Sequence, residues 1–479
     1  MDIDDSLAAA HINIDLLYIK FISSFRKHTA IFFFCLETQY SNHFYLKMCA
    51  SNLVSSVCKK IIKPYFPTPT SLRCHKFSYL DQMVGGIYVP FAFFYPKLSN
   101  TWSDKPSNVI SEHLENSLSK VLSHYYPFAG KLNENISVDC NDRGVEFFTT
   151  KIDCPMAKIL KDPYSDKEDL VYPKGIPCTY SYEGSLAVVQ LSYFNCGGIA
   201  VSACLTHKVG DGYTIANFIR DWATIARNPS SKIQSPQFNA ASIYPPTKDM
   251  VNLPEIVPKG EECSSKSFAF SSSKLAALKS MVINNSVVQN PTATEIVSAF
   301  IYQRAMATKK KTSGSICPSV LVQAMNLRPP LPKTLMGNIG SFFSVITTEE
   351  KEMDLPRVVG KLREAKQEVR KKYKHDKTDE FLPMTIELFR EANDSFFNNS
   401  CYDIYRFSSI NKFPFYDIDF GWGKPEKVSL ASNGPVKNMF VLIDNKSRDG
   451  MEVVSCMKEQ DTSALERDEE LLKFTSPSN

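Results

Sequence analysis

Apolar residues follow two patterns along the chain: short dense runs and longer stretches with helical spacing. The run Tyr88–Tyr95 (YVPFAFFY), ended by Pro96, is typical of a buried strand. Apolar positions three or four residues apart predict a helix over 110–124. The same patterns predict strands at 144–150, 186–193, 199–205, 267–270, 319–325, 439–444 and 451–457, and helices at 213–226, 273–283, 292–307 and 358–373. Strands and helices mix without a regular order, which predicts a mixed α/β (α+β) fold class.

Residues 1–47 differ from the rest of the chain. They lack turn signals, carry three of the eight histidines and end just before Met48. One interpretation is a flexible N-terminal helix. The other is an extension that the natural protein does not use, with Met48 as its true first residue. We favour the second.

Residues 228–265 are rich in Pro, Ser, Lys and Asn and show no periodicity. A stretch of this length without structure is uncommon inside a compact domain, so we interpret it as a linker. It would join a first domain at 48–227 to a second at 266–479. The segment near 407–428 is a candidate for return to the sheet of the first domain.

Composition excludes several classes of protein. The 479 residues are 43% hydrophobic and 22% charged, with a net charge of +4 and no basic block, so no nucleic-acid partner is expected. Thirteen cysteines without CxxC pairs indicate reduced thiols in a cytoplasmic protein. The start is acidic, and the apolar stretch Ala30–Leu36 is far shorter than the ~20 residues that span a bilayer. We therefore expect neither secretion nor membrane association.

Several common catalytic motifs are missing from the sequence. It contains no Walker A loop, GxGxxG, HExxH or GxSxG. The usual sequence signals for ATP, dinucleotide, zinc-protease and esterase chemistry are therefore missing. We expect no metal site and no permanently bound cofactor.

His207 is the first candidate for catalysis. A predicted strand of small residues ends there, and Gly210 and Gly212 follow, which lets the imidazole be displayed from a tight turn. A neutral imidazole can take a proton from a hydroxyl. Asp211 stands four residues on and would share a face with His207 on a regular helix. The glycines make that helix doubtful, so a framework role for this histidine and a His–Asp dyad both remain open.

A second segment, Asp419-Phe-Gly-Trp-Gly423, changes the interpretation. Together, HKVGDG and DFGWG resemble the HxxxDG and DFGWG signatures of the plant BAHD acyltransferases. The resemblance covers residues 52–475 and is closest to the vinorine synthase, capsaicin synthase-like and acylsugar acyltransferase branch. It includes the segments Pro67-Thr-Pro69, Ser78-Tyr-Leu-Asp81, Tyr126–Leu132, Asn326-Leu-Arg328 and Met336-Gly-Asn338.

The resemblance implies two similar-sized domains like those of chloramphenicol acetyltransferase, each a mixed sheet with flanking helices. A channel between them would hold His207 at its centre, with acyl-CoA entering from one mouth and the acceptor from the other. It further implies a monomer that forms no acyl-enzyme, because the acceptor attacks the thioester directly. Cys204, on the strand before His207, is then expected to be a core residue.

The resemblance also implies roles for individual residues. Asp211 would pair with Arg328 and hold the HKVGDG turn, which includes Gly212, rather than orient His207. Trp422 is a candidate oxyanion donor, with packing as the alternative. Lys266 and Ser267 are candidates for contact with the nucleotide end of CoA, and Lys424 could contact a CoA phosphate or be solvated. The remaining DFGWG residues would fix a loop in the channel wall: Asp419, Phe420, Gly421 and Gly423.

The sequence therefore predicts an acyl-CoA-dependent O-acyltransferase acting on a hydroxyl of a plant specialised metabolite, an acyl sugar or an alkaloid alcohol. Three alternatives stay open. The acceptor could be an amine, as in capsaicin-type amide formation. The protein could be a catalytically silent homologue that binds acyl-CoA. It could also hydrolyse the thioester, with water as the acceptor.

Overall fold

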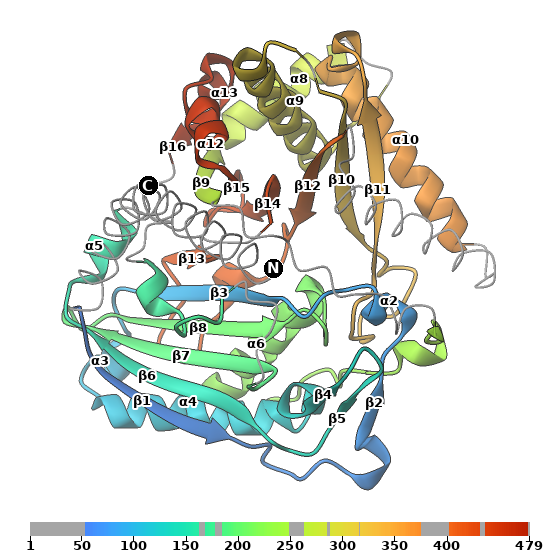
Figure 1. The fold of residues 1–479 in the computed structure, drawn as a ribbon. Coiled ribbons are helices and arrows are strands. Elements are labelled where there is room, and N and C mark those ends of the chain that lie inside the picture. Colours follow the sequence, from blue (N-terminus) through green and yellow to red (C-terminus); the bar gives the residue numbers. More distant parts are fainter. Residues whose placement is uncertain are drawn as a thin grey trace, which may run out of the picture. The chain divides into compact units, whose positions relative to one another are not determined.

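The structure is a computed structural model in which two large sheets each carry their own layer of helices (Figure 1). Residues 1–47 and residues 249–262 of the expected linker lie outside the part of the chain that it describes. The described residues are 53–161, 168–177, 184–248, 263–284, 288–315, 317–374, 402–431 and 436–477.

The first sheet has six strands and is built mainly from the first half of the chain. β6 and β7 pair in parallel, whereas β7–β8, β8–β3 and β3–β13 pair antiparallel. Its strand order is β1 (Val54–Ile62), β6 (Val145–Ile152), β7 (Ala187–Phe194), β8 (Ile199–Thr206), β3 (Tyr88–Tyr95) and β13 (Lys427–Ser429). The late segment 427–429 thus adds the last strand of this early sheet.

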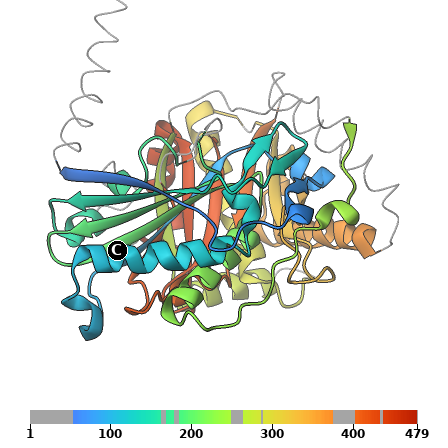
Figure 2. The ribbon, with the colours of Figure 1, turned by 90° about the horizontal axis from the view of Figure 1, so that it is seen from below.

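Two helices cover one face of the first sheet. α4 (Ser107–Leu122) and α6 (Gly212–Arg227) contact each other and lie on the same side of the strands (Figure 2). Their apolar faces join one core with the inward side chains of β3, β6, β7 and β8. All eight residues of β8 are buried, which suits its small side chains.

The second sheet has seven strands and a separate core. Its order is β11 (Gly340–Thr347), β10 (Ser319–Asn326), β12 (Asp403–Ser409), β14 (Met439–Asp444), β15 (Met451–Lys458), β9 (Cys263–Phe270) and β16 (Ser476–Pro477). Helices on one face contribute most of the apolar contacts of this core: α8 (Ser272–Asn284), α9 (Ala293–Ser313), α10 (Leu355–Lys374), α12 (Glu459–Glu466) and α13 (Glu469–Phe474).

A small sheet and a short helix complete the framework near the first half. The small sheet has the order β2 (Cys74–Lys76), β5 (Ser137–Asp139) and β4 (Lys131–Asn133). The short helix α2 (Tyr79–Gln82) is fully buried. Among the described helices, none is long and apolar enough to cross a membrane.

The described part of the expected linker is packed against the protein although it has little regular structure. It contains one 3-10 turn, Ala240–Ser242. Gln237 exchanges backbone hydrogen bonds with the segment around Thr334 and Met336, at 2.8 Å each. These contacts tie residues 228–248 to a loop of the second half.

Candidate active site

His207 stands one residue beyond the end of β8. Thr206 pairs with Tyr88 of β3, and the His207 N–H donates to the Ile87 carbonyl at 2.7 Å, which extends the ladder by one residue. The backbone of His207 is therefore fixed by the sheet before the chain turns into α6.

Asn338 holds the imidazole of His207. The His207 Nδ1 lies 2.9 Å from Asn338 Oδ1. The Asn338 Nδ2 group donates to the His207 carbonyl at 2.9 Å and to Asp81 Oδ1 at 3.0 Å, so its amide oxygen is the atom that faces the ring. A carbonyl oxygen only accepts, so Nδ1 carries the proton and Nε2 of the neutral ring keeps its lone pair. That tautomer is the one a general base requires.

Asp81 anchors Asn338 in turn. It is fully buried and caps α2 in a capping box with Ser78, whose backbone N–H and hydroxyl both donate to Asp81 Oδ2, at 2.9 and 2.6 Å. Its other oxygen accepts from the Asn338 backbone N–H at 2.8 Å and from the Asn338 amide. We did not assign roles to Asp81 or Asn338 from the sequence. Both residues stand in segments that carry the family resemblance, and the Ser-x-x-Asp capping signature is a further local signal for Asp81.

Asp211 uses both carboxylate oxygens away from His207. It is the N-cap of α6, where Oδ1 accepts from the Thr214 N–H at 2.9 Å. Oδ2 accepts from Arg328 Nη1 at 2.8 Å and from the Ile339 N–H at 3.0 Å. Burial acts to raise the pKa of Asp211, but the Arg328 charge and these hydrogen bonds hold it below its usual value. Asp211 therefore fastens the turn and does not form a relay with the imidazole.

Arg328 links the two halves of the chain at this site. Its side chain is 0% exposed, and its guanidinium donates to the carbonyls of Leu335 and Gly337 while lying 4.7 Å from the Tyr213 ring. Gly337 has φ +117°, and a Cβ there would lie 3.3 Å from Asp81 Oδ1. A side chain at 337 would thus be strained and would press on the carboxylate behind Asn338.

The DFGWG segment forms a closed loop. Asp419 Oδ1 accepts from the backbone N–H groups of Gly421 and Gly423, at 2.8 and 2.9 Å. Both glycines have φ near +115°, a conformation that other residues rarely adopt. Phe420 is fully buried and Trp422 is 1% exposed. The loop is therefore held by its own carboxylate and by two aromatic anchors.

Trp422 does not lie beside His207. Its ring packs 5.9 Å from Tyr95 and 5.5 Å from Trp102, and its indole Nε1 has no hydrogen-bond partner among the described residues. Tyr95 is seven residues along β3 from Tyr88, the strand neighbour of the site. At about 3.3 Å per residue, that separation is about 23 Å. This distance does not support the expectation that Trp422 donates to the thioester oxygen and favours the packing alternative.

Lys266 and Ser267 lie on β9 in the second sheet. Lys266 forms an exposed ion pair with Glu466 at 3.2 Å, and Ser267 stands opposite Val454 of β15. Their expected contact with CoA stays a prediction. Within the described ranges, no group of three or more His, Cys, Asp or Glu side chains is placed to hold a metal ion.

Asn338 offers a direct test of this geometry. Replacing Asn338 by Ala removes the acceptor that fixes the tautomer and orientation of His207, so we expect kcat to fall by about ten- to a hundredfold, as for a misplaced catalytic group. KM for acyl-CoA should change little because Asn338 contacts the imidazole of His207 at Nδ1 and not at Nε2, the nitrogen left free to accept. Steady-state kinetics of the purified variant measures both. An unchanged kcat in a folded variant would show that the tautomer is set elsewhere.

Two mixed sheets, with His207 held where segments of both halves meet, define the two-domain fold of the chloramphenicol acetyltransferase-like class of acyltransferases. A model of the Transferase family matches residues 53–472, and the chain belongs to this family, the BAHD acyltransferases. It is an acyl-CoA-dependent acyltransferase.

Relatives with known names indicate which branch of the family this chain is similar to. The chain is 42% identical to acylsugar acyltransferase 3 of Solanum lycopersicum, over 90% of this chain and 99% of that protein. It is 41% identical to acyltransferase Pun1 of Capsicum frutescens, over 88% and 98% respectively. Among solved structures, vinorine synthase superposes with a TM-score of 0.76 at 31% identity, covering 89% of this chain and 99% of that chain.

Proposed function

We propose that the protein transfers an acyl group from acyl-CoA to a hydroxyl of a plant specialised metabolite, an acyl sugar or an alkaloid alcohol. The single observation that carries the mechanism is the hydrogen bond between His207 Nδ1 and Asn338 Oδ1, which leaves Nε2 as an acceptor. The acceptor class rests on the similarity to acylsugar acyltransferase 3 and vinorine synthase.

The proposed reaction is one direct transfer in a ternary complex. His207 Nε2 takes the hydroxyl proton as the acceptor oxygen bonds to the thioester carbonyl carbon. The carbon–sulfur bond then breaks, and the imidazolium returns the proton to the departing CoA thiolate. The products are the ester and free CoA, and the histidine ends neutral. Cys204 is fully buried in β8, which argues against a cysteine nucleophile from this strand.

A mass-spectrometric screen tests this proposal. The purified full chain would be incubated with several acyl-CoAs and an acceptor panel of sugars, acyl sugars, alkaloid alcohols and amines. We expect an ester product and stoichiometric CoA release that depends on the acceptor. Amide products alone would replace O-acylation with N-acylation. CoA release without acceptor would indicate hydrolysis, and CoA binding without any turnover would indicate a silent homologue.

We further propose a cytoplasmic monomer with domains at 48–227 and 266–479 joined by residues 228–265. Five described cysteines form no disulfide, which supports a reducing compartment: Cys58, Cys74, Cys140, Cys196 and Cys317. Light scattering of the purified protein tests the monomer, and removal of residues 1–47 tests whether the reaction needs them.

A further inference from the structure

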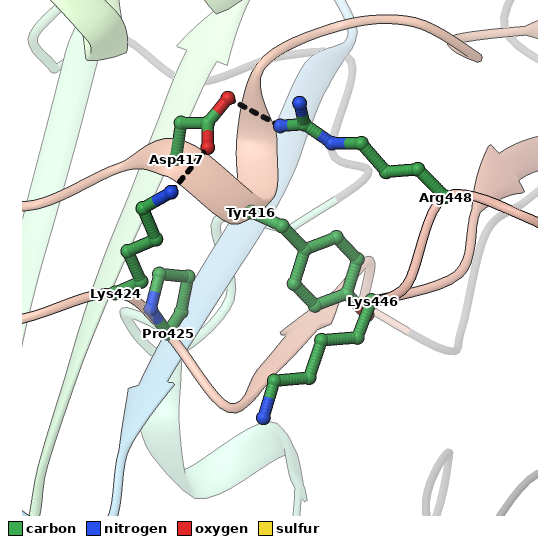
Figure 3. A pocket seen from close by; sticks show the side chains of 6 residues that line it. All are labelled: Tyr416, Asp417, Lys424, Pro425, Lys446 and Arg448. Atoms are coloured by element: carbon green, nitrogen blue, oxygen red, sulfur yellow. Dashed lines mark hydrogen bonds and ion pairs between the residues drawn. The ribbon is translucent and has the colours of Figure 1, made fainter.

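Lys208, the residue that follows His207, is buried although it is a lysine. It is 7% exposed, and lysine is rarely found inside a protein unless it is paired. The surface cavity in Figure 3 shows the usual arrangement: the side chain of Lys424 is 66% exposed and pairs with the Asp417 carboxylate at 2.9 Å. A buried ammonium is costly unless hydrogen bonds compensate it. Lys208 must therefore have partners inside the fold.

The ammonium of Lys208 binds the end of α2. Its Nζ donates to the Val84 carbonyl at 2.6 Å and to the Gln82 carbonyl at 3.3 Å. It also lies 5.6 Å from the centre of the Phe77 ring, whose face attracts a cation. Gln82 is the last residue of α2, and Val84 follows two positions later. Lys208 thus fastens this helix to the turn that carries His207.

The remaining contacts of α2 lead to the imidazole. Asp81 accepts from the Asn338 backbone N–H at 2.8 Å and from its amide group at 3.0 Å. Because that amide nitrogen points to Asp81, the amide oxygen faces His207 Nδ1, at 2.9 Å. If α2 shifted, the Asn338 amide would be free to turn over. Its N–H would then donate to Nδ1, and the proton of the neutral ring would move to Nε2, which could no longer act as a base.

Lys208 also places positive charge near a buried carboxylate. Asp81 is fully buried, and Ser78 and Asn338, which donate to its two oxygens, are both neutral. A buried charge without an opposite charge nearby is destabilising. The ammonium of Lys208 binds the carbonyl of Gln82, the residue next to Asp81. Its loss would therefore weaken the hydrogen bonds between Asn338 and Asp81 by releasing the helix and by removing the charge.

We propose that Lys208 is a positioning residue for the acyl-transfer reaction. It acts through α2, Asp81 and Asn338, and it keeps the proton of the neutral His207 ring on Nδ1 so that Nε2 can accept. The inference rests on the proposed role of His207 as the general base. Lys208 is not a second base, because its Nζ is bound to two carbonyls of the protein.

The tautomer of His207 is the first readout. The full chain, labelled with nitrogen-15 histidine and kept at mildly alkaline pH, gives separate signals for protonated and unprotonated ring nitrogens, and His207→Ala assigns the signals of this residue. We expect wild type to carry its proton on Nδ1. Lys208→Met keeps an apolar stem but has no ammonium, so we expect a mixture of tautomers or a proton on Nε2. Lys208→Arg keeps the charge and the donors and should restore the wild-type signals.

Steady-state kinetics gives the second readout. Lys208→Met should lower kcat by about ten- to a hundredfold, as for a misplaced catalytic group, with KM for acyl-CoA within about twofold of wild type. In an Asn338→Ala background the same change should lower kcat no further, because the residue through which Lys208 acts is already gone. Equal losses of kcat in both backgrounds would overturn the proposal.

Lys427→Met is the matched control. Lys427, on β13, is another largely buried lysine: its side chain is 14% exposed and pairs with Glu452 at 3.1 Å. This variant should lower the unfolding midpoint but leave the His207 signals as in wild type. If Lys208→Met does not fold, Lys208→Gln takes its place in both readouts. A folded Lys208 variant without the ammonium that keeps the proton on Nδ1 would refute the inference.

This inference and the proposed function fail separately. The ring signals are read without any substrate, so a protein that acylates nothing in the mass-spectrometric screen would refute the proposed function while the dependence of the tautomer on Lys208 is still measured. An active enzyme whose His207 tautomer and kcat are the same with and without the Lys208 ammonium would refute the inference alone.

Discussion

His207→Ala is expected to lower kcat by about 10²–10⁴, the range for loss of a general base. The reason is geometric: Nε2 is the nitrogen left free to accept once Asn338 occupies Nδ1. KM for acyl-CoA should be nearly unchanged, because the proton transfer is made in the transition state and not in binding. Acceptor-dependent CoA release, followed continuously with a thiol reagent, measures both constants.

His124→Ala is the matched control for this variant. His124 is an exposed histidine just beyond the end of α4, so its loss should leave kcat and the unfolding midpoint as in wild type. If His207→Ala folds and keeps full turnover, the base must be another residue. If it loses activity together with its folded structure, Asn338→Ala becomes the more informative variant, since it leaves the imidazole in place.

The sequence predicted the parts of the fold that depend on local patterns. The strand expected over Tyr88–Tyr95 has these bounds in the structure, and the helix expected at 292–307 begins with the Thr292 capping box and runs on to Ser313. β11 was not predicted. It alternates buried Phe343 and Val345 with exposed Phe342 and Ile346, so its apolar pattern does not separate the two faces.

Two edge strands depend on contacts that their own sequence does not reveal: β1 was not predicted, and β13 falls at the end of the segment near 407–428 that was a candidate for return to the first sheet. β1 is an edge strand whose central residues are all exposed. Because no face of this strand is buried, its sequence need not alternate apolar and polar residues, and that alternation is the pattern that would predict a strand. β13 has three residues and takes its place through pairing with β3, more than 330 positions earlier. Short edge strands of this kind are determined by tertiary contacts and not by their own sequence.

Apart from the pairing of Asp211 with Arg328, which the family resemblance implied, the site was predictable only where one segment carries the chemistry. His207 and its glycines stand together in the sequence, so their display from a turn could be inferred. Asn338 and Asp81 act through contacts that span 131 and 257 positions. Nothing local marks an asparagine as the partner of an imidazole. A motif also does not indicate how far its residues lie from the rest of the site. Trp422 and His207 belong to the two family motifs, yet they are well separated in the structure.

Arg328 is expected to affect both the orientation of His207 and the stability of the folded protein. The loop that supplies Asn338 is held by Arg328, whose guanidinium binds two carbonyls of that loop and the carboxylate of Asp211. Asp211 in turn caps the helix that follows His207. The imidazole is thus oriented by a residue of the second half, and that residue is positioned by an ion pair with the first half. Loss of the ion pair should act on both properties.

Arg328→Leu is expected to destabilise the protein by about 3–5 kcal/mol, the cost of removing one partner of a buried pair. The substitution leaves the Asp211 charge uncompensated and removes the guanidinium donors from the Leu335 and Gly337 carbonyls. Chemical denaturation followed by circular dichroism measures the loss. Arg328→Leu combined with Asp211→Asn is the matched control: removing the stranded charge should restore part of the stability, and a double variant no more stable than Arg328→Leu would contradict this explanation.

The same pair predicts a pH dependence with a definite sign. In wild type the pKa of Asp211 lies below its usual value of about 3.9, so the unfolded chain binds more protons than the folded one in that range. This contribution is fully present above the unfolded pKa and is lost as pH falls through the lower, folded pKa. In Arg328→Leu, burial still acts to raise the pKa of Asp211 and the Thr214 hydrogen bonds still act to lower it, but the lowering effect of the Arg328 charge is lost, so this pKa is higher than in wild type. The stability gap between wild type and Arg328→Leu should therefore narrow as pH falls below about 5. A gap that stays constant from pH 7 to pH 3 would show that the lost stability comes from the carbonyl contacts and not from the charge of Asp211.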